Sequence, residues 1–137
     1  MADNTGPGVY KQLEEYFETQ CKNILKGVKK ITKAHARNCK ENIKRDSPVN
    51  TADDGKTHRV YKNGWRVSTY ENPFSIQCEV HQYRRPYLTW LLEDGHLLPD
   101  GSRTKAQPHI RKNGEKELDE WFLELSSLEF LDGKDLW

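Results

Sequence analysis

The sequence of 137 residues is poor in hydrophobic residues and has no long apolar run. Hydrophobic residues make up 34% of the chain and charged residues 31%, and the mean hydropathy is -0.98. Nowhere do about 18 consecutive apolar residues occur, as a membrane-spanning helix requires, and the N-terminus has no apolar signal region. We therefore expect one domain made in the cytosol, with a modest core that partner chains extend.

Paired cysteines and the short motifs of common enzymes are also missing. Cys21, Cys39 and Cys78 are odd in number and too far apart for a CxxC pair, which argues against a disulfide framework and a zinc knuckle. The sequence contains no GxSxG, P-loop, GxGxxG or HExxH pattern. It therefore predicts reduced thiols, no catalytic residues and no cofactor.

The net charge of +1 conceals two oppositely charged segments. Residues 115–135 are strongly acidic, whereas basic residues recur every three or four positions earlier in the chain, at Lys22, Lys26, Lys29, Lys33, Arg37, Lys40 and Lys44. This basic stripe has three interpretations: a solvated helix face, a surface that follows DNA phosphates, or a surface that docks on the acidic segment of a neighbouring copy around Glu117, Glu120 and Glu124. Opposed charges on one chain favour head-to-tail rings.

Hydrophobic periodicity predicts two amphipathic helices. Residues 8–46 have the three-and-four spacing of one long helix, from Leu13 and Phe17 to His35, which ends before Pro48. Leu118, Trp121 and Leu125 predict a second helix over residues 115–131, starting after Gly114.

Between these helices, residues 58–83 are rich in Val, Tyr and Trp and predict strands, with Asn63-Gly64 as a turn or bulge. Residues 86–95 predict a short helix that stops at Gly95, and residues 96–110 a long loop. The expected fold is a single α+β domain over residues 1–137. In it, the long N-terminal helix and the C-terminal helix pack on a small antiparallel sheet.

His and carboxylate side chains around this loop could be drawn together as metal ligands, namely His81, Glu93, Asp94, His96 and His109. Their spacing fits no known metal motif, so we expect no metal there. We expect instead that each imidazole forms hydrogen bonds with the backbone where the loop leaves and rejoins the fold.

The loop itself has the composition of an interface element. Gly101, Ser102, Arg103 and Lys105 predict mobility in an isolated chain, yet Leu97 and Leu98 would be exposed there unless another chain covers them. The predicted loop anchors and subunit interface comprise Glu93, Gly95, His96, Leu97, Leu98, Arg103, Lys105, Pro108, His109 and Ile110.

The order of these segments resembles a known protein family. From about Ala34 to Glu124 a basic helix is followed by "SPVNT", "GKTHRVYKNGWRV", "YLTWLLEDGH", a Gly/Arg/Lys loop and "QPHI". This order is similar to the head-to-tail joining, or tail-component, family of tailed bacteriophages and prophages. Two positions depart from the family: Trp90 stands where related sequences often have histidine, and Arg111 opens a polar stretch to Gly114 where a helix usually begins sooner.

The resemblance implies a structural virion protein and no catalysis. Such a protein forms a homo-oligomeric ring in the phage neck, between the capsid connector and the tail tube, and its partners are its own copies, other head-completion and tail proteins and DNA passing through the channel. In this setting His96 and His109 would anchor a loop that reaches a neighbouring subunit. The alternatives are a metal-dependent phage nuclease or hydrolase using His81, His96 and His109, and a DNA-binding module using the basic stripe.

Overall fold

The computed structural model describes residues 7–51 and 57–128, and these form an α+β fold as the sequence predicts. Helix α1 spans Pro7–Asp46, followed by the short strands β1 (Asn50–Thr51) and β2 (Thr57–His58). After the 3-10 turn η1 (Lys62–Gly64) come strands β3 (Trp65–Asn72) and β4 (Ser75–Gln82), helix α2 (Leu88–Asp94) and helix α3 (Arg111–Ser126).

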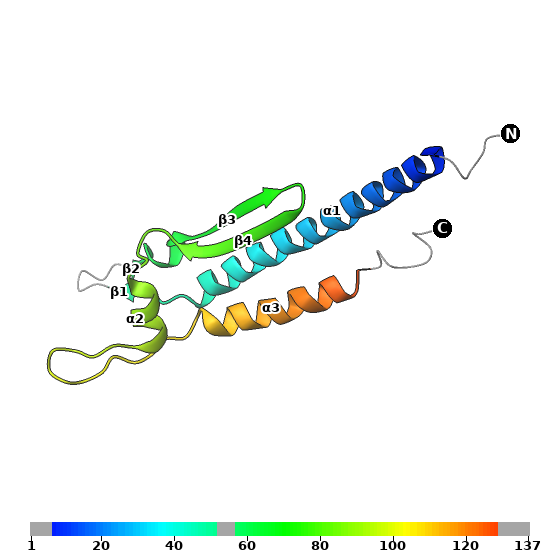
Figure 1. Cartoon of the computed structure of the whole chain (residues 1–137). Helices are drawn as coiled ribbons and strands as arrows, with labels where there is room; N and C mark the ends of the chain where they lie inside the picture. Colours follow the sequence, from blue (N-terminus) through cyan, green and yellow to red (C-terminus); the bar gives the residue numbers. More distant parts are fainter. Residues whose placement is uncertain (1–6, 52–56, 129–137) are drawn as a thin grey trace.

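Helix α1 is the longest element of the described chain, and the hairpin and α3 both lie along it (Figure 1). Its 40 residues extend for about 60 Å at 1.5 Å per residue. It ends where Pro48 excludes helical geometry at the preceding residue, and the Ser47 hydroxyl donates a hydrogen bond of 2.6 Å to the Ile43 carbonyl. The Trp65 indole N–H donates to the same hydroxyl oxygen at 2.8 Å, so the end of α1 is tied to the start of β3.

Strands β3 and β4 form an antiparallel hairpin with Trp65 opposite Gln82 and Asn72 opposite Ser75. The predicted turn at Asn63-Gly64 is the 3-10 turn η1, which separates β2 from β3. Gly64 is required there because a Cβ atom would lie 1.8 Å from the Gln82 side-chain oxygen. The Gln82 amide in turn donates to the Tyr61 carbonyl at 2.7 Å, which fixes the base of the hairpin.

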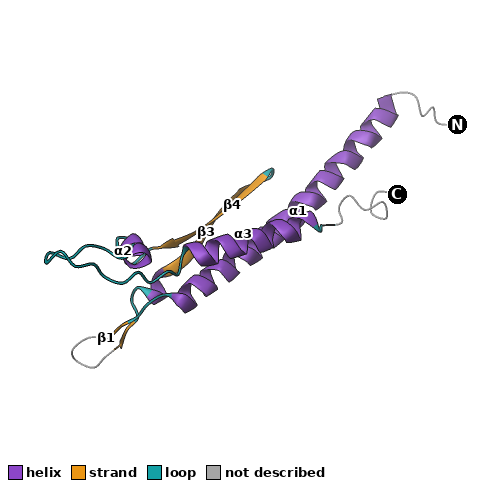
Figure 2. Ribbon diagram, turned by 90° about the horizontal axis from the view of Figure 1, so that it is seen from below, coloured by secondary structure: helices purple, strands orange, loops and turns teal. Residues whose placement is uncertain are grey.

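Helix α3 runs antiparallel to α1 and lies beside it in both views (Figures 1 and 2). The prediction that this helix starts after Gly114 is wrong, since it begins four residues earlier, at Arg111. The cause lies outside the segment: the Glu93 side chain accepts hydrogen bonds from the backbone N–H groups at the start of α3. The predicted end at residue 131 is wrong as well, because the helix ends at Ser126, where the Ser127 N–H donates to the Leu123 and Glu124 carbonyls and caps the last turn.

The buried core is small and sits where α1, the hairpin and α2 meet. Ile43, Tyr61 and Trp65 are its buried apolar residues, and half-buried side chains from β4, α2 and the start of α3 pack against them. Both helices were expected to pack on the sheet, but α3 packs mainly against α1. Helix α1 therefore lies against the hairpin and α3 at once.

The first half of α1 extends beyond the hairpin and α3 (Figure 2). Tyr10, Leu13 and Phe17 are exposed there, and regular partial burial on this helix begins only near Ile24. The apolar spacing that predicted the helix therefore continues past the part of α1 that the described chain covers.

Candidate functional site

The loop between α2 and α3 projects from the end of the molecule opposite the first turn of α1 (Figure 1). It is fixed at its base by Glu93, a side chain only 3% exposed at the end of α2. The Glu93 carboxylate accepts hydrogen bonds from the backbone N–H groups of His109, Ile110 and Arg111 at 2.8, 2.9 and 3.0 Å. One carboxylate thus holds both the returning end of the loop and the N-terminus of α3.

Electrostatics keep this carboxylate ionised. Burial alone would raise the pKa of Glu93, but the hydrogen bonds from the three backbone N–H groups outweigh burial and lower it. The negative charge therefore persists in a site that excludes water. Hydrogen bonds of this charged kind are stronger than neutral ones.

His109 is fully buried beneath the loop base. Its Nδ1 lies 2.7 Å from the Gln107 carbonyl, which can only accept, so the proton is on Nδ1. In the neutral ring Nε2 then accepts from the Tyr61 hydroxyl at 2.6 Å. Burial and the charge of Glu93 raise the pKa of Tyr61, which keeps that hydroxyl protonated as a donor.

The loop beyond this base is a narrow, hydrogen-bonded hairpin. Leu97 pairs with Arg103 in an isolated β-bridge, and the Thr104 N–H donates to the His96 carbonyl at 2.9 Å. The Thr104 hydroxyl oxygen accepts from the His96 N–H at 2.8 Å, so His96, which is half-buried, joins the two sides of the loop. Gly95 turns the chain into the loop with φ +72°, where a Cβ atom would lie 2.5 Å from the Thr104 carbonyl oxygen.

Side chains on both sides of this hairpin are exposed. Leu97 is 67% exposed and Leu98 38% exposed, and Arg103, Lys105 and Pro108 are exposed as well. Of the residues predicted from sequence, Glu93, Gly95, His109 and Ile110 thus form the base. His96 bridges the two sides of the loop, and Leu97 and Leu98 form an apolar tip.

Among the described residues, His81, His96 and His109 do not come together as metal ligands. His109 is enclosed by Tyr61 and Gln107, His96 contacts Thr104, and His81 lies on β4. The geometry therefore gives no support to a hydrolase centre built from these three histidines.

The basic stripe runs along α1 and faces the tip of the β3–β4 hairpin over part of its length. A groove of about 650 Å³ is lined there by Lys22, Lys26, Lys29, Lys30 and Lys33 together with Glu71. Lys29 donates to the Asn72 carbonyl at 2.6 Å, and Lys33 pairs with Glu71 at 3.2 Å. The hairpin thus engages two lysines of the stripe within the chain.

The acidic face of α3 contacts α1 at His35. The sequence placed this histidine only on the apolar face of the long helix and indicated no role for it. His35 is 9% exposed and lies between two carboxylates of α3. Its Nδ1 lies 2.5 Å from Glu117, and its Nε2 forms a short hydrogen bond with Glu124. Burial alone would lower the pKa of His35, but the hydrogen bonds with Glu124 and Glu117 outweigh burial and raise it.

Glu117 is itself 4% exposed, so it faces His35 rather than a lysine of a neighbouring copy. Glu120 and Glu124 remain on the surface of α3. Two sequence signals could have located this cluster. One is the i, i+3, i+7 spacing of the three glutamates on α3, and the other is the single histidine in the otherwise apolar stripe of α1.

No protein-family model, curated protein or solved structure matches the chain. Among the described residues, no helix is long and apolar enough to cross a membrane. The functional argument therefore rests on the loop, the basic stripe and the cluster at His35.

Proposed function

We propose that the chain is a structural virion protein of the phage neck, a ring-forming head-tail joining or tail completion component that lies between the capsid connector and the tail tube. The observation that carries the proposal is the projecting loop, which has an apolar tip on a rigid base. A loop held by Glu93 and His109 loses little further entropy when a partner binds it. Exposed leucines on such a loop indicate a protein contact.

Helix α1 supports an assembled state in the same way. Its first half displays Tyr10, Leu13 and Phe17 beyond the rest of the described chain. A neighbouring subunit that covered these side chains would add to the small core of the monomer. The proposal requires no catalytic residue and no cofactor.

The test is a double substitution at the loop tip, Leu97→Asp with Leu98→Asp, in the phage or prophage that encodes the chain. Both residues are exposed, so the fold should persist, as circular dichroism and thermal unfolding would verify. Two charges placed in an apolar contact cost several kcal/mol, so joining of heads to tails should fail. Normal yield of infectious particles that contain the variant would refute the interface.

A second candidate, binding of DNA along the basic stripe, is favoured by the five lysines that line the groove beside the hairpin tip, four of which belong to the stripe. Such a row would follow phosphates, and its affinity for DNA would fall steeply with salt. Salt-dependent binding of duplex DNA by the purified chain at low micromolar concentration tests this candidate. Absence of binding even at low salt would leave the stripe as a solvated face.

A further inference from the structure

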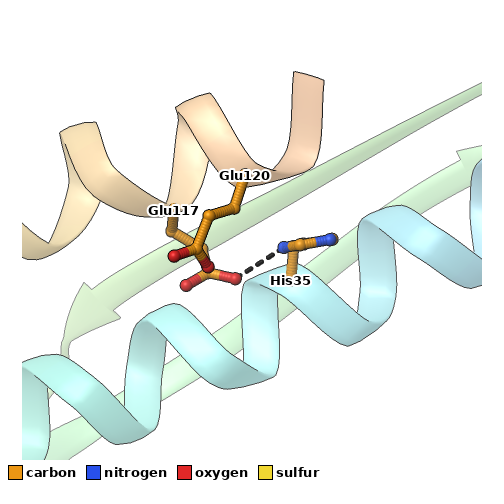
Figure 3. A group of neighbouring side chains, drawn as sticks. All are labelled: His35, Glu117 and Glu120. Carbon is orange, nitrogen blue, oxygen red and sulfur yellow. Dashed lines mark hydrogen bonds and ion pairs between the residues drawn. The ribbon is translucent and has the colours of Figure 1, made fainter. Parts of the chain in front are cut away.

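A second cluster of ionisable side chains, separate from the loop, lies between α1 and α3 (Figure 3). His35 on α1 faces Glu117 and Glu120, which project from successive turns of α3 toward the same space. One potential ligand atom from each of the three residues lies within 4.8 Å of the other two. His35 and Glu117 are buried, and Glu120 is exposed.

The charges in this cluster do not balance. Glu117, Glu120 and Glu124 bring three carboxylates, whereas α1 brings only the His35 imidazole. In the part of the chain that the structure describes, no lysine or arginine forms an ion pair with these glutamates. Even a protonated His35 leaves the group with an excess of negative charge, which a divalent cation would offset.

We propose that His35, Glu117 and Glu120 form a binding site for a divalent transition-metal ion of the zinc class. Imidazole nitrogen and carboxylate oxygen are the usual nitrogen and oxygen ligands of such ions. Facing helices that each contribute inward side chains are a common framework for metal sites, and Glu117 and Glu120 have the i, i+3 spacing that places two ligands on one helix face.

The two nitrogens of His35 have the separate partners that such a site needs. Nδ1 faces Glu117, whereas the Nε2–H group donates to Glu124. A ligating histidine almost always donates its other ring N–H to a carboxylate or a carbonyl, which orients the ring. Glu124 is therefore an orienting carboxylate rather than a ligand, and the metal takes the place of the proton on Nδ1, which leaves to solvent.

To admit the ion, Glu117 must move, and the exposed Glu120, whose oxygen lies within 4.8 Å of the other two ligand atoms, is free to adjust. Ligands at about 2.1 Å from a tetrahedral metal lie about 3.4 Å from one another. Nδ1 and the Glu117 oxygen are 2.5 Å apart, so this carboxylate must move outward by about 1 Å. A groove of about 330 Å³, lined in part by His35, Glu117 and Trp121, adjoins the cluster and supplies an entry path.

Glu120 distinguishes between two interpretations of the cluster, a metal site and a simple hydrogen-bonded link between the helices. The link needs only His35, Glu117 and Glu124, and Glu120 forms no hydrogen bond or ion pair in the described residues. Glu120→Gln therefore removes one ligand of the metal but leaves both hydrogen bonds of His35 in place. Asp119→Asn is the matched control, since Asp119 is an exposed acid on the same helix outside the cluster.

The experiment uses the full chain, free of affinity tag and stripped of metal, and titrates it with Zn²⁺ against a chromogenic chelator. We expect one Zn²⁺ per chain with a micromolar or lower dissociation constant, a loss of at least about tenfold in Glu120→Gln, and no change in Asp119→Asn. Zn²⁺ should also raise the Tm of the wild type more than that of Glu120→Gln. His35→Ala should abolish binding, with circular dichroism verifying its fold.

Two results would overturn the site. One is the absence of saturable Zn²⁺ binding by the wild-type chain at micromolar concentration. The other is binding that is as tight in Glu120→Gln as in the wild type, because the ion would then be held elsewhere. Neither result depends on assembly of a virion, so this inference and the proposed neck function fail or succeed separately.

Discussion

Glu93→Ala offers the sharpest test of the loop base, since a single carboxylate holds three backbone N–H groups there. The substitution leaves those donors without their partner beneath the loop. An unsatisfied buried donor costs about 1–3 kcal/mol, and loss of a helix N-cap costs about 1 kcal/mol. Because water can reach part of the opened site, we expect a loss of about 3–5 kcal/mol in the free energy of unfolding.

The assay is urea unfolding followed by circular dichroism, with Asp94→Asn as the matched control. Asp94 neighbours Glu93 and pairs with Arg111 at 2.8 Å, but both side chains of that pair are about half exposed. An exposed ion pair contributes less than about 1 kcal/mol. If Glu93→Ala cost no more than Asp94→Asn, the loop would not be anchored by the carboxylate and the account of its rigid base would be refuted.

The same group predicts a dependence on pH. The pKa of Glu93 is lower in the folded chain than its usual value of 4.5, so the folded state binds fewer protons here than the unfolded state does. Its contribution to stability is complete above the unfolded pKa and is lost as the pH falls through the folded pKa. In Glu93→Gln this acid-dependent loss should be smaller than in the wild type, and equal losses would assign the acid sensitivity to other carboxylates.

Three further predictions concern other parts of the molecule. Gly95→Ala should destabilise the chain by about 1–3 kcal/mol, because φ is +72° and Thr104 blocks the Cβ position, whereas Gly101→Ala, with open space around it, should cost less in the same urea assay. Tyr61→Phe should cost about 1–3 kcal/mol, since it leaves the buried Nε2 of His109 without its donor, and an unchanged unfolding midpoint would refute that bond. A third test replaces four lysines of the stripe by Gln, at Lys26, Lys29, Lys33 and Lys40. This variant should impair DNA delivery if the stripe lines a channel, or ring assembly if the stripe docks on a neighbouring subunit. Normal assembly together with normal DNA delivery would exclude both roles.

The parts of the fold that sequence predicted best are those set by local rules. The long helix ends where Pro48 forbids its continuation, and Gly95 ends the short helix because its φ is positive. The strands, the turn at Asn63-Gly64 and the α+β class likewise depend on residues close together in the chain.

The parts that sequence could not supply depend on distant partners. No residue near Arg111 in the sequence indicates a helix start there. The acceptor of the Arg111 N–H is the carboxylate of Glu93, which lies eighteen residues earlier. His35 fits an apolar periodicity, and only the antiparallel packing of α3 brings Glu117 to it across 82 positions. The exposure of the first half of α1 could not be predicted from the sequence either. The spacing of apolar residues predicts a helix face, but it does not show what covers that face.

The central claim, that the chain is a ring component of the phage neck, is tested most directly by electron microscopy of particles and purified tails labelled for this protein. The account predicts label confined to the junction between head and tail, as one ring per particle, and loss of joined particles when the loop tip is charged. Label spread over the capsid or along the tail tube, or particles that lack the protein and still join heads to tails, would contradict it.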